Sequence, residues 1–234
     1  MVSVSNSRRK RQGGQEIIEF ALMAVLFVPM FLGAFVTGMG LIRSIQVNHV
    51  CRDIDNLFIH GGDFSTYAMQ QLAQRIATGL NLQIGISFTG NSATNTGNSG
   101  DGIVRVSQIM WIGSTTSTSC KSVGAANCTN HDNFVFTQRV NFGNGSLADP
   151  NSLGNPTTST INSAGVIINP ITDAGAKLPS ANQAAMQGLW QVSTNNRAPM
   201  VDGQVAYVVE VYAQSPGLAI GNLGGGAQYA RYFF

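Results

Sequence analysis

The sequence predicts an α+β protein, in which one long N-terminal helix precedes a domain with an antiparallel sheet of about four strands. Two observations predict this class. Residues 20–42 contain no charged side chain, which is typical of a helix that crosses a membrane. Farther along the chain, the spacing of apolar residues changes from three and four to two, which indicates a change from helices to strands.

Composition supports a membrane-associated chain. Charged residues make up 10% of the 234 residues and hydrophobic ones 44%, which excludes disorder of the whole chain. The net charge of +2 is too small for a typical nucleic-acid-binding protein, so no nucleic acid partner is predicted. Four basic residues and no acid lie in residues 1–14, and only Arg43 directly follows the uncharged run. This asymmetry places the N-terminus in the cytoplasm and residues 43–234 outside.

The uncharged run is long enough to stay in the membrane. As a helix it measures about 34 Å, whereas the hydrocarbon core of a bilayer is about 30 Å thick. Pro29 predicts a kink or a locally melted turn within it. A cleaved secretory signal is the alternative, but its apolar core has about 7–15 residues and a small-residue cleavage site follows it. We therefore expect a retained transmembrane helix.

A motif directly precedes this run. Arg8, Arg9, Lys10 and Arg11 are followed by a pair of glycines at 13 and 14, and Glu19 comes five positions after Gly14. This stretch resembles the processing site of type IV-type prepilins, in which a membrane aspartyl protease cuts after a glycine on the cytoplasmic side. The resemblance implies cleavage between Gly14 and Gln15, which makes Glu19 the fifth mature residue and Phe20 the sixth. It divides the chain into a leader (1–14), a transmembrane and assembly helix (15–60) and an extracytoplasmic α+β domain (61–234).

The residues of the motif have physical roles. Glycines resist helix formation, so Gly14 and its neighbour favour an extended peptide that a protease can reach. A carboxylate at the start of an apolar run is costly unless it is paired. In the family, the corresponding glutamate pairs with the freed N-terminal amine of a neighbouring subunit, which here means Glu19 with the Gln15 amine. The alternative is a plain signal anchor in which Glu19 extends toward the headgroups.

Two further stretches narrow the resemblance. Residues 18–22 (Ile-Glu-Phe-Ala-Leu) look like the anchor of TadE/TadF-type minor pilins of tight-adherence pili, and residues 206–212, followed by Ser215 and Pro216, look like a late strand of that family. The resemblance implies a type IV pilin-like fold and a structural subunit for the assembly, initiation or tip of an adhesion filament.

The same resemblance implies partners and a location. The partners would be a prepilin peptidase, other pilin subunits in a homo- or hetero-oligomeric filament, the inner-membrane assembly platform and membrane lipid. The location would be the bacterial inner membrane and then the pilus at the cell surface. A signal-anchored extracytoplasmic binding module and a type II secretion pseudopilin are the alternatives.

Apolar stripes predict two helices after the membrane segment. Positions three and four apart form the first stripe (Val47, Val50, Ile54, Leu57 and Phe58) and the second (Phe64, Ala68, Leu72, Ile76 and Leu80). A glycine pair at 61 and 62 ends the first helix, and Asp63 is the expected N-cap of the second.

Alternating patterns predict strands at residues 82–88, 103–112, 134–142 and 205–213, and the tail at 229–234 is a candidate edge strand. A short helix is expected at 181–190 with Ser180 as its cap. Stretches rich in Ser, Thr, Asn and Gly at 89–102, 113–131 and 143–165 favour solvated turns. These stretches are either passive loops or a polar recognition surface for a glycan, a host or a partner.

Cysteines and motifs suggest a structural protein. Cys120 and Cys128 are expected to form a disulfide in an oxidising compartment. The alternatives are two free thiols or a metal pair with His131, which supports a zinc site only weakly. Cys51 is expected to be buried on the helix, with an intersubunit disulfide as the alternative. Because the sequence contains no nucleophile-elbow, zincin, phosphate-loop or C-x-x-C motif, we predict no catalytic residues, no metal site, no cofactor and no enzyme activity.

Overall fold

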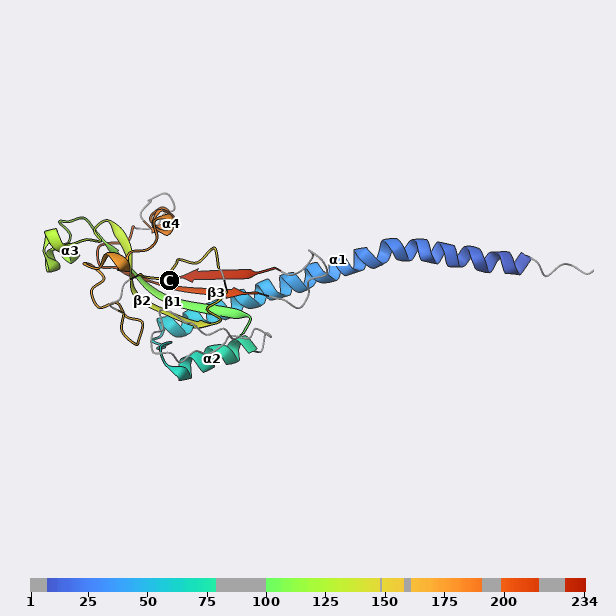
Figure 1. Cartoon of the computed structure of the whole chain (residues 1–234), viewed down its shortest axis with the longest axis horizontal. Helices are drawn as coiled ribbons and strands as arrows, with labels where there is room; N and C mark the ends of the chain where they lie inside the picture. The colour runs from blue at the N-terminus through green and yellow to red at the C-terminus, as the bar shows by residue number, and fades with distance from the viewer. Residues whose placement is uncertain (1–7, 79–99, 148, 158–160, 191–198, 215–225) are drawn as a thin grey trace, which may run out of the picture. The chain divides into compact units, whose positions relative to one another are not determined.

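The computed structural model describes residues 8–78, 100–147, 149–157, 161–190, 199–214 and 226–234 (Figure 1). Its elements follow in the order α1 (Arg8–Ile59), α2 (Tyr67–Thr78), β1 (Gly102–Ile112), α3 (Thr118–Val123), η1 (Ala125–Asn127), β2 (Asn133–Gly143), η2 (Ala174–Ala176), α4 (Ser180–Trp190), β3 (Val205–Ala213) and β4 (Gln228–Phe233). The chain therefore combines a long N-terminal helix with a four-stranded antiparallel sheet, as the sequence predicts at the level of fold class.

The chain divides into two compact units. One unit comprises residues 1–42 and 216–226, and the other comprises residues 43–215 and 227–234. The uncharged run of α1 thus belongs to the first unit, while the last part of α1 and the whole sheet belong to the second.

Helix α1 is continuous over 52 residues. Pro29 lies inside it, and the residues on both sides of the proline are helical. The locally melted turn, one of the two outcomes expected at this proline, is absent. A proline removes a single intrahelical hydrogen bond, which a long helix tolerates.

The last part of α1 packs on the sheet through the predicted stripe. Val50 and Ile54 are fully buried, and Leu57 is partly buried against them. They share a core with alternate residues of three strands, among them Val106, Val140 and Val209. The prediction of this amphipathic segment is confirmed.

Helix α2 begins later than predicted. The Asp63 side chain accepts hydrogen bonds from the backbone amide and the hydroxyl of Ser65, so it closes a turn that precedes the helix. Asp63 is therefore not the N-cap of α2, and Phe64 lies outside the helix. The predicted stripe is correct in part, because Phe64 is buried and Ile76 packs against the core, whereas Ala68 and Leu72 are exposed. Ala73 and Ala77 are the buried apolar residues of α2. Leu80 lies outside the described residues.

The sheet has the order β2-β1-β3-β4, with all neighbours antiparallel. The strands predicted at 103–112, 134–142 and 205–213 are confirmed as β1, β2 and β3, and the tail forms the edge strand β4. The strand predicted at 82–88 lies outside the described residues. At the other edge, β2 is covered by the chain itself, since Gln138 bridges to Val166 and Val135 bridges to Lys177.

The face of the sheet opposite α1 is covered by irregular segments. A second core includes Ile109, Phe136 and Val208 from the strands, and Leu153, Leu178 and Met186 from the covering chain. The stretches 113–131 and 143–165 are thus not merely solvated turns, because they contain α3, η1 and fully buried side chains such as Cys120 and Leu153. Helix α4 is confirmed, although it includes Ser180 instead of being capped by it.

Candidate functional site

The motif residues of the N-terminus lie exposed on α1. Gly14, Gln15, Glu19 and Phe20 are all exposed, and Phe20 retains 76% of its accessible surface. Gln15 and Glu19 are four residues apart and so lie on the same side of the helix. Gly14 itself is helical, and the extended peptide expected there is absent in this structure. A protease that cuts after Gly14 would first have to unwind this turn, which glycine makes easier because it disfavours helix by about 1 kcal/mol relative to alanine.

The surface that follows is apolar and exposed. Exposed large hydrophobic residues of α1 include Leu22, Val25, Leu26, Phe31 and Leu41. Among the described residues, α1 is the one helix that is long and apolar enough to cross a membrane. Because such a continuous apolar surface is unfavourable in water, it requires lipid or another protein as its environment.

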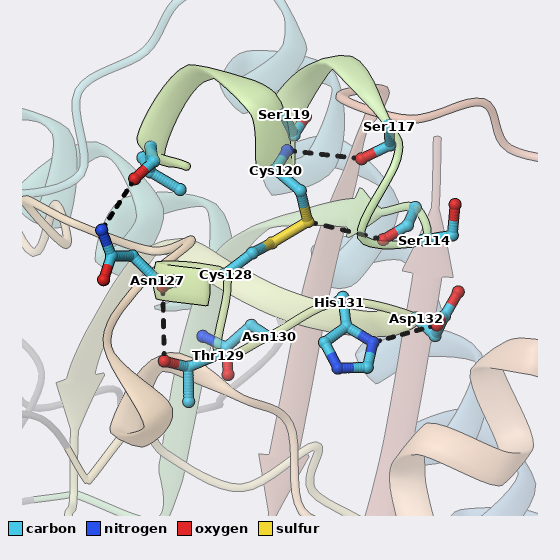
Figure 2. Close-up of a disulfide and its surroundings, with 12 residues drawn as sticks. Ser114, Ser117, Ser119, Cys120, Asn127, Cys128, Thr129, Asn130, His131 and Asp132 are labelled. Carbon is cyan, nitrogen blue, oxygen red and sulfur yellow. Dashed lines mark hydrogen bonds and ion pairs between the residues drawn. A yellow bond between two sulfur atoms is a disulfide. The ribbon is translucent and has the colours of Figure 1, made fainter. Parts of the chain in front are cut away.

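The disulfide joins Cys120 on α3 to Cys128 after η1, as predicted (Figure 2). Ser117 caps α3, because its hydroxyl accepts a hydrogen bond from the amide of Cys120. The Asp202 carboxylate, from the turn before β3, accepts hydrogen bonds from the amides of Gly113 and Ser119, both at 2.8 Å. The disulfide therefore closes this loop on itself, and the Asp202 carboxylate attaches it to the chain just before β3.

The residues near the disulfide do not form a metal site. His131 pairs with the neighbouring Asp132, with 3.0 Å between imidazole Nδ1 and carboxylate Oδ2 (Figure 2). Because both cysteines are consumed by the disulfide, the alternative of a cysteine–histidine metal pair is wrong for this structure. Within the described ranges, no group of three or more potential ligands from His, Cys, Asp and Glu comes together.

Cys51 lies in the core between α1 and the sheet. Its side chain is fully buried, and its thiol donates to the carbonyl oxygen of Val209 at 3.3 Å. The expectation that Cys51 is a small buried side chain is confirmed. A disulfide between subunits would require this residue to leave the core.

A cluster of buried charges lies on the sheet face opposite α1. Glu210 in β3 has a fully buried side chain, and its Oε2 accepts a hydrogen bond from Arg139 of β2 at 2.7 Å. Its Oε1 accepts hydrogen bonds from Tyr229 and Arg231 of β4 at 2.8 and 3.1 Å. The backbone amide of Leu153 donates to the same oxygen at 2.8 Å. One carboxylate thus binds two strands and the chain that crosses over them.

Residues 149–155, hereafter the strap, cover this cluster through polar contacts. Asp149 forms an ion pair with Arg105 of β1 at 2.7 Å, and the carbonyl oxygen of Asn151 accepts from Arg231. Arg139 donates to the Ser152 hydroxyl at 3.2 Å, and Asn155 accepts from Arg139 at 3.3 Å. Leu153 is the fully buried apolar residue of the strap. The strap therefore supplies partners for two buried arginines, Arg105 and Arg139, and for the partly buried Arg231.

The charges of the cluster determine the protonation states of Glu210 and Tyr229. Burial raises the pKa of the Glu210 carboxyl, but Arg139, Arg231 and the hydrogen bonds from its donors outweigh this and hold the pKa below its ordinary value. Burial, followed by the charge of Glu210, raises the pKa of the Tyr229 phenol. Glu210 is consequently an acceptor and Tyr229 a donor at neutral pH.

The sequence does not predict this cluster. Glu210 within the apolar run 206–212 is the one local sign of an acid that needs a buried partner. Nothing near Arg139 or Arg231 in the sequence indicates that they meet the same carboxylate. The motif residues of α1 belong to one unit and the Glu210 cluster belongs to the other.

No protein-family model, curated protein or solved structure matches the chain.

Proposed function

We propose that this protein is a structural subunit of a type IV-like filament, similar to the TadE/TadF minor pilins, and that it acts by assembly and not by catalysis. Residues 1–14 are the leader that a prepilin peptidase removes. The uncharged run of α1 remains in the bacterial inner membrane with its N-terminus in the cytoplasm. The second unit lies outside and reaches the surface when the subunit joins the filament.

One observation carries the proposal. An exposed, uncharged apolar helix surface begins directly after the exposed carboxylate of Glu19, which is four residues from Gln15 on the same side of the helix. In lipid this carboxylate needs a cation. Cleavage after Gly14 creates one in the Gln15 amine, and the resemblance to the pilins makes the amine of a neighbouring copy the partner that we propose.

The apolar surface supports the same partners. Other pilin subunits bury it in a filament, membrane lipid buries it before assembly, and the inner-membrane assembly platform meets it during the transfer. The polar disulfide loop and the strap belong to the unit that would face outward, where an oxidising compartment favours the bond between Cys120 and Cys128.

Cleavage is tested by a glycine substitution in the native host. A Cβ added at Gly14 or at Gly33 meets no heavy atom within 4 Å, so neither alanine disturbs the fold of the subunit. Gly14→Ala should reduce the release of the leader at least tenfold, because it changes the peptide that the peptidase binds and strengthens the helix by about 1 kcal/mol. Gly33→Ala, the matched control on the same helix, should be cleaved normally. Mass spectrometry of membrane and sheared fractions measures both.

The mature N-terminus decides between the candidate classes. Sheared filaments should contain the protein beginning at Gln15. Protein that still begins at Met1 and that stays in the membrane fraction would contradict the proposal and favour a signal-anchored binding module. Cleaved protein that remains in the cell envelope, with no filament recovered, would favour a type II secretion pseudopilin.

A further inference from the structure

We propose that Glu210 is a latch that makes the strap and the C-terminal strand β4 open and close as one unit. This inference concerns the second unit alone and does not depend on cleavage or on filament assembly. It rests on the number of separate segments that share one buried carboxylate.

The contacts of Glu210 join three segments that are distant in sequence. Arg139 is 71 residues away on β2, the Leu153 amide is 57 residues away on the strap, and Arg231 is 21 residues away on β4. The strap amide and both β4 side chains, Tyr229 and Arg231, bond to the same oxygen, Oε1. If the strap or β4 moves away, Glu210 Oε1 loses one or more of its donors. The hydrogen bonds that this oxygen makes to the remaining segment therefore change.

Arg231 adds a second link between the same two segments. Its guanidinium donates to the carbonyl oxygen of Asn151 in the strap as well as to Glu210, and it lies over the rings of Tyr229 and Phe233 in its own strand. If β4 leaves, the strap loses the donor for this carbonyl. If the strap leaves, Arg231 loses the Asn151 carbonyl oxygen as an acceptor and Glu210 loses the Leu153 amide as a donor, so the contacts that hold β4 are weakened.

The strands away from β4 are held by longer pairing and do not depend on Glu210 alone. Strands β1 and β2 pair over ten residues, while β4 pairs with β3 over six and lies at the edge. The core between α1 and the sheet takes just one residue, Ala230, from β4 among its fully buried members. Opening of the strap and β4 should therefore leave α1, β1 and β2 packed, as expected for a separately opening unit of a domain.

Hydrogen exchange of the full chain in detergent micelles tests the latch. In the wild type, the amides of Leu153 and of Phe234, which donates to Tyr207, should exchange with the same free energy of opening and the same dependence on denaturant. The amides between β1 and β2 should exchange more slowly. Different denaturant dependences for Leu153 and Phe234 would overturn the proposal, and this measurement requires no variant to fold.

Substitution gives the second test. Glu210→Gln keeps the size of the side chain but removes the charge, so exchange should accelerate on the order of a hundredfold at both Leu153 and Phe234. Asp149→Asn removes the ion pair between the strap and Arg105. Because the strap and β4 open together, it should accelerate exchange at Leu153 and Phe234 by the same factor. Asp132→Asn is the control, because Asp132 is an exposed acid outside the cluster, and it should leave both amides protected. Acceleration of the strap without β4, in Glu210→Gln or in Asp149→Asn, would overturn the latch.

Discussion

At the scale of single residues, two carboxylates stabilise the fold by accepting hydrogen bonds from the groups around them. Asp202 and Glu210 both bind backbone amides, and the pKa of each carboxyl lies below its ordinary value. They differ in surroundings, since Glu210 is fully buried among arginines and Asp202 is partly exposed beside the disulfide loop. Asp202 is therefore the simpler residue in which to measure what one such acceptor contributes.

We predict that Asp202→Asn lowers the free energy of unfolding by about 1–2 kcal/mol at pH 7, because one of the two amide hydrogen bonds loses its acceptor. Burial raises the pKa of the Asp202 carboxyl, but the amides of Gly113 and Ser119 outweigh this and lower it. Its contribution is thus present above the unfolded pKa of about 4 and is lost as the pH falls through the lower folded pKa. The free energies of unfolding of the wild type and the variant should therefore converge as the pH falls below about 4.

Chemical denaturation followed by tryptophan fluorescence, from pH 7 to pH 3, checks this prediction. Asp132→Asn is the control, because Asp132 is exposed and pairs with a neighbouring histidine. An undiminished difference between Asp202→Asn and the wild type at low pH would show that the ionised carboxylate is not the source of the effect.

At the scale of elements, the chain stabilises short irregular segments with specific bonds where apolar area is small. The loop with α3 and η1 exposes most of its side chains and depends on the disulfide, the Ser117 cap and Asp202. The strap depends on ion pairs and on Leu153. In contrast, the last part of α1 is held by an apolar stripe, which needs no specific partner.

Removal of the disulfide should affect its own loop first. We predict that the double variant Cys120→Ala and Cys128→Ala loses about 2–3 kcal/mol, because the unfolded chain is no longer constrained over this short loop. Limited proteolysis should then cut within residues 113–131 before it cuts the sheet. A reductant should have the same effect on the wild type and none on the double variant. An equal effect of the reductant on both proteins would contradict the assignment to this bond.

At the scale of the whole molecule, the two units have different surfaces. The first exposes a continuous apolar helix that requires lipid or protein around it. The second has its own core on both faces of the sheet. In the function that we propose, the first unit assembles the subunit and the second carries the surface that the filament displays.

The proposed assembly depends on Glu19. We predict that Glu19→Ala leaves cleavage after Gly14 intact but reduces recovery in sheared filaments on the order of tenfold, since the neighbouring amine loses its partner in a medium of low polarity. Glu16→Ala is the matched control, an exposed acid three residues earlier on the same helix, and should assemble normally. Quantitative immunoblotting of sheared and cell-bound fractions measures the ratio. Normal assembly of Glu19→Ala would rule out the pairing role.

The sequence by itself determined those features that depend on neighbouring residues. The uncharged run of α1, the stripe with Val50 and Ile54, the strands β1, β2 and β3, and the disulfide all follow from local period, composition or spacing. The start of α2 was missed because Asp63 forms a turn that looks, in sequence, like a helix cap.

The tertiary structure alone decided which polar residues are buried. In a strand, alternation makes Arg105 and Arg139 look like outward, solvated positions, whereas the strap covers that face and turns both into buried charges. The partners of Glu210 lie up to 71 residues away, and no local pattern records such a distance. Local periodicity reports which side of an element is apolar. Only the packed chain determines what lies on the other side.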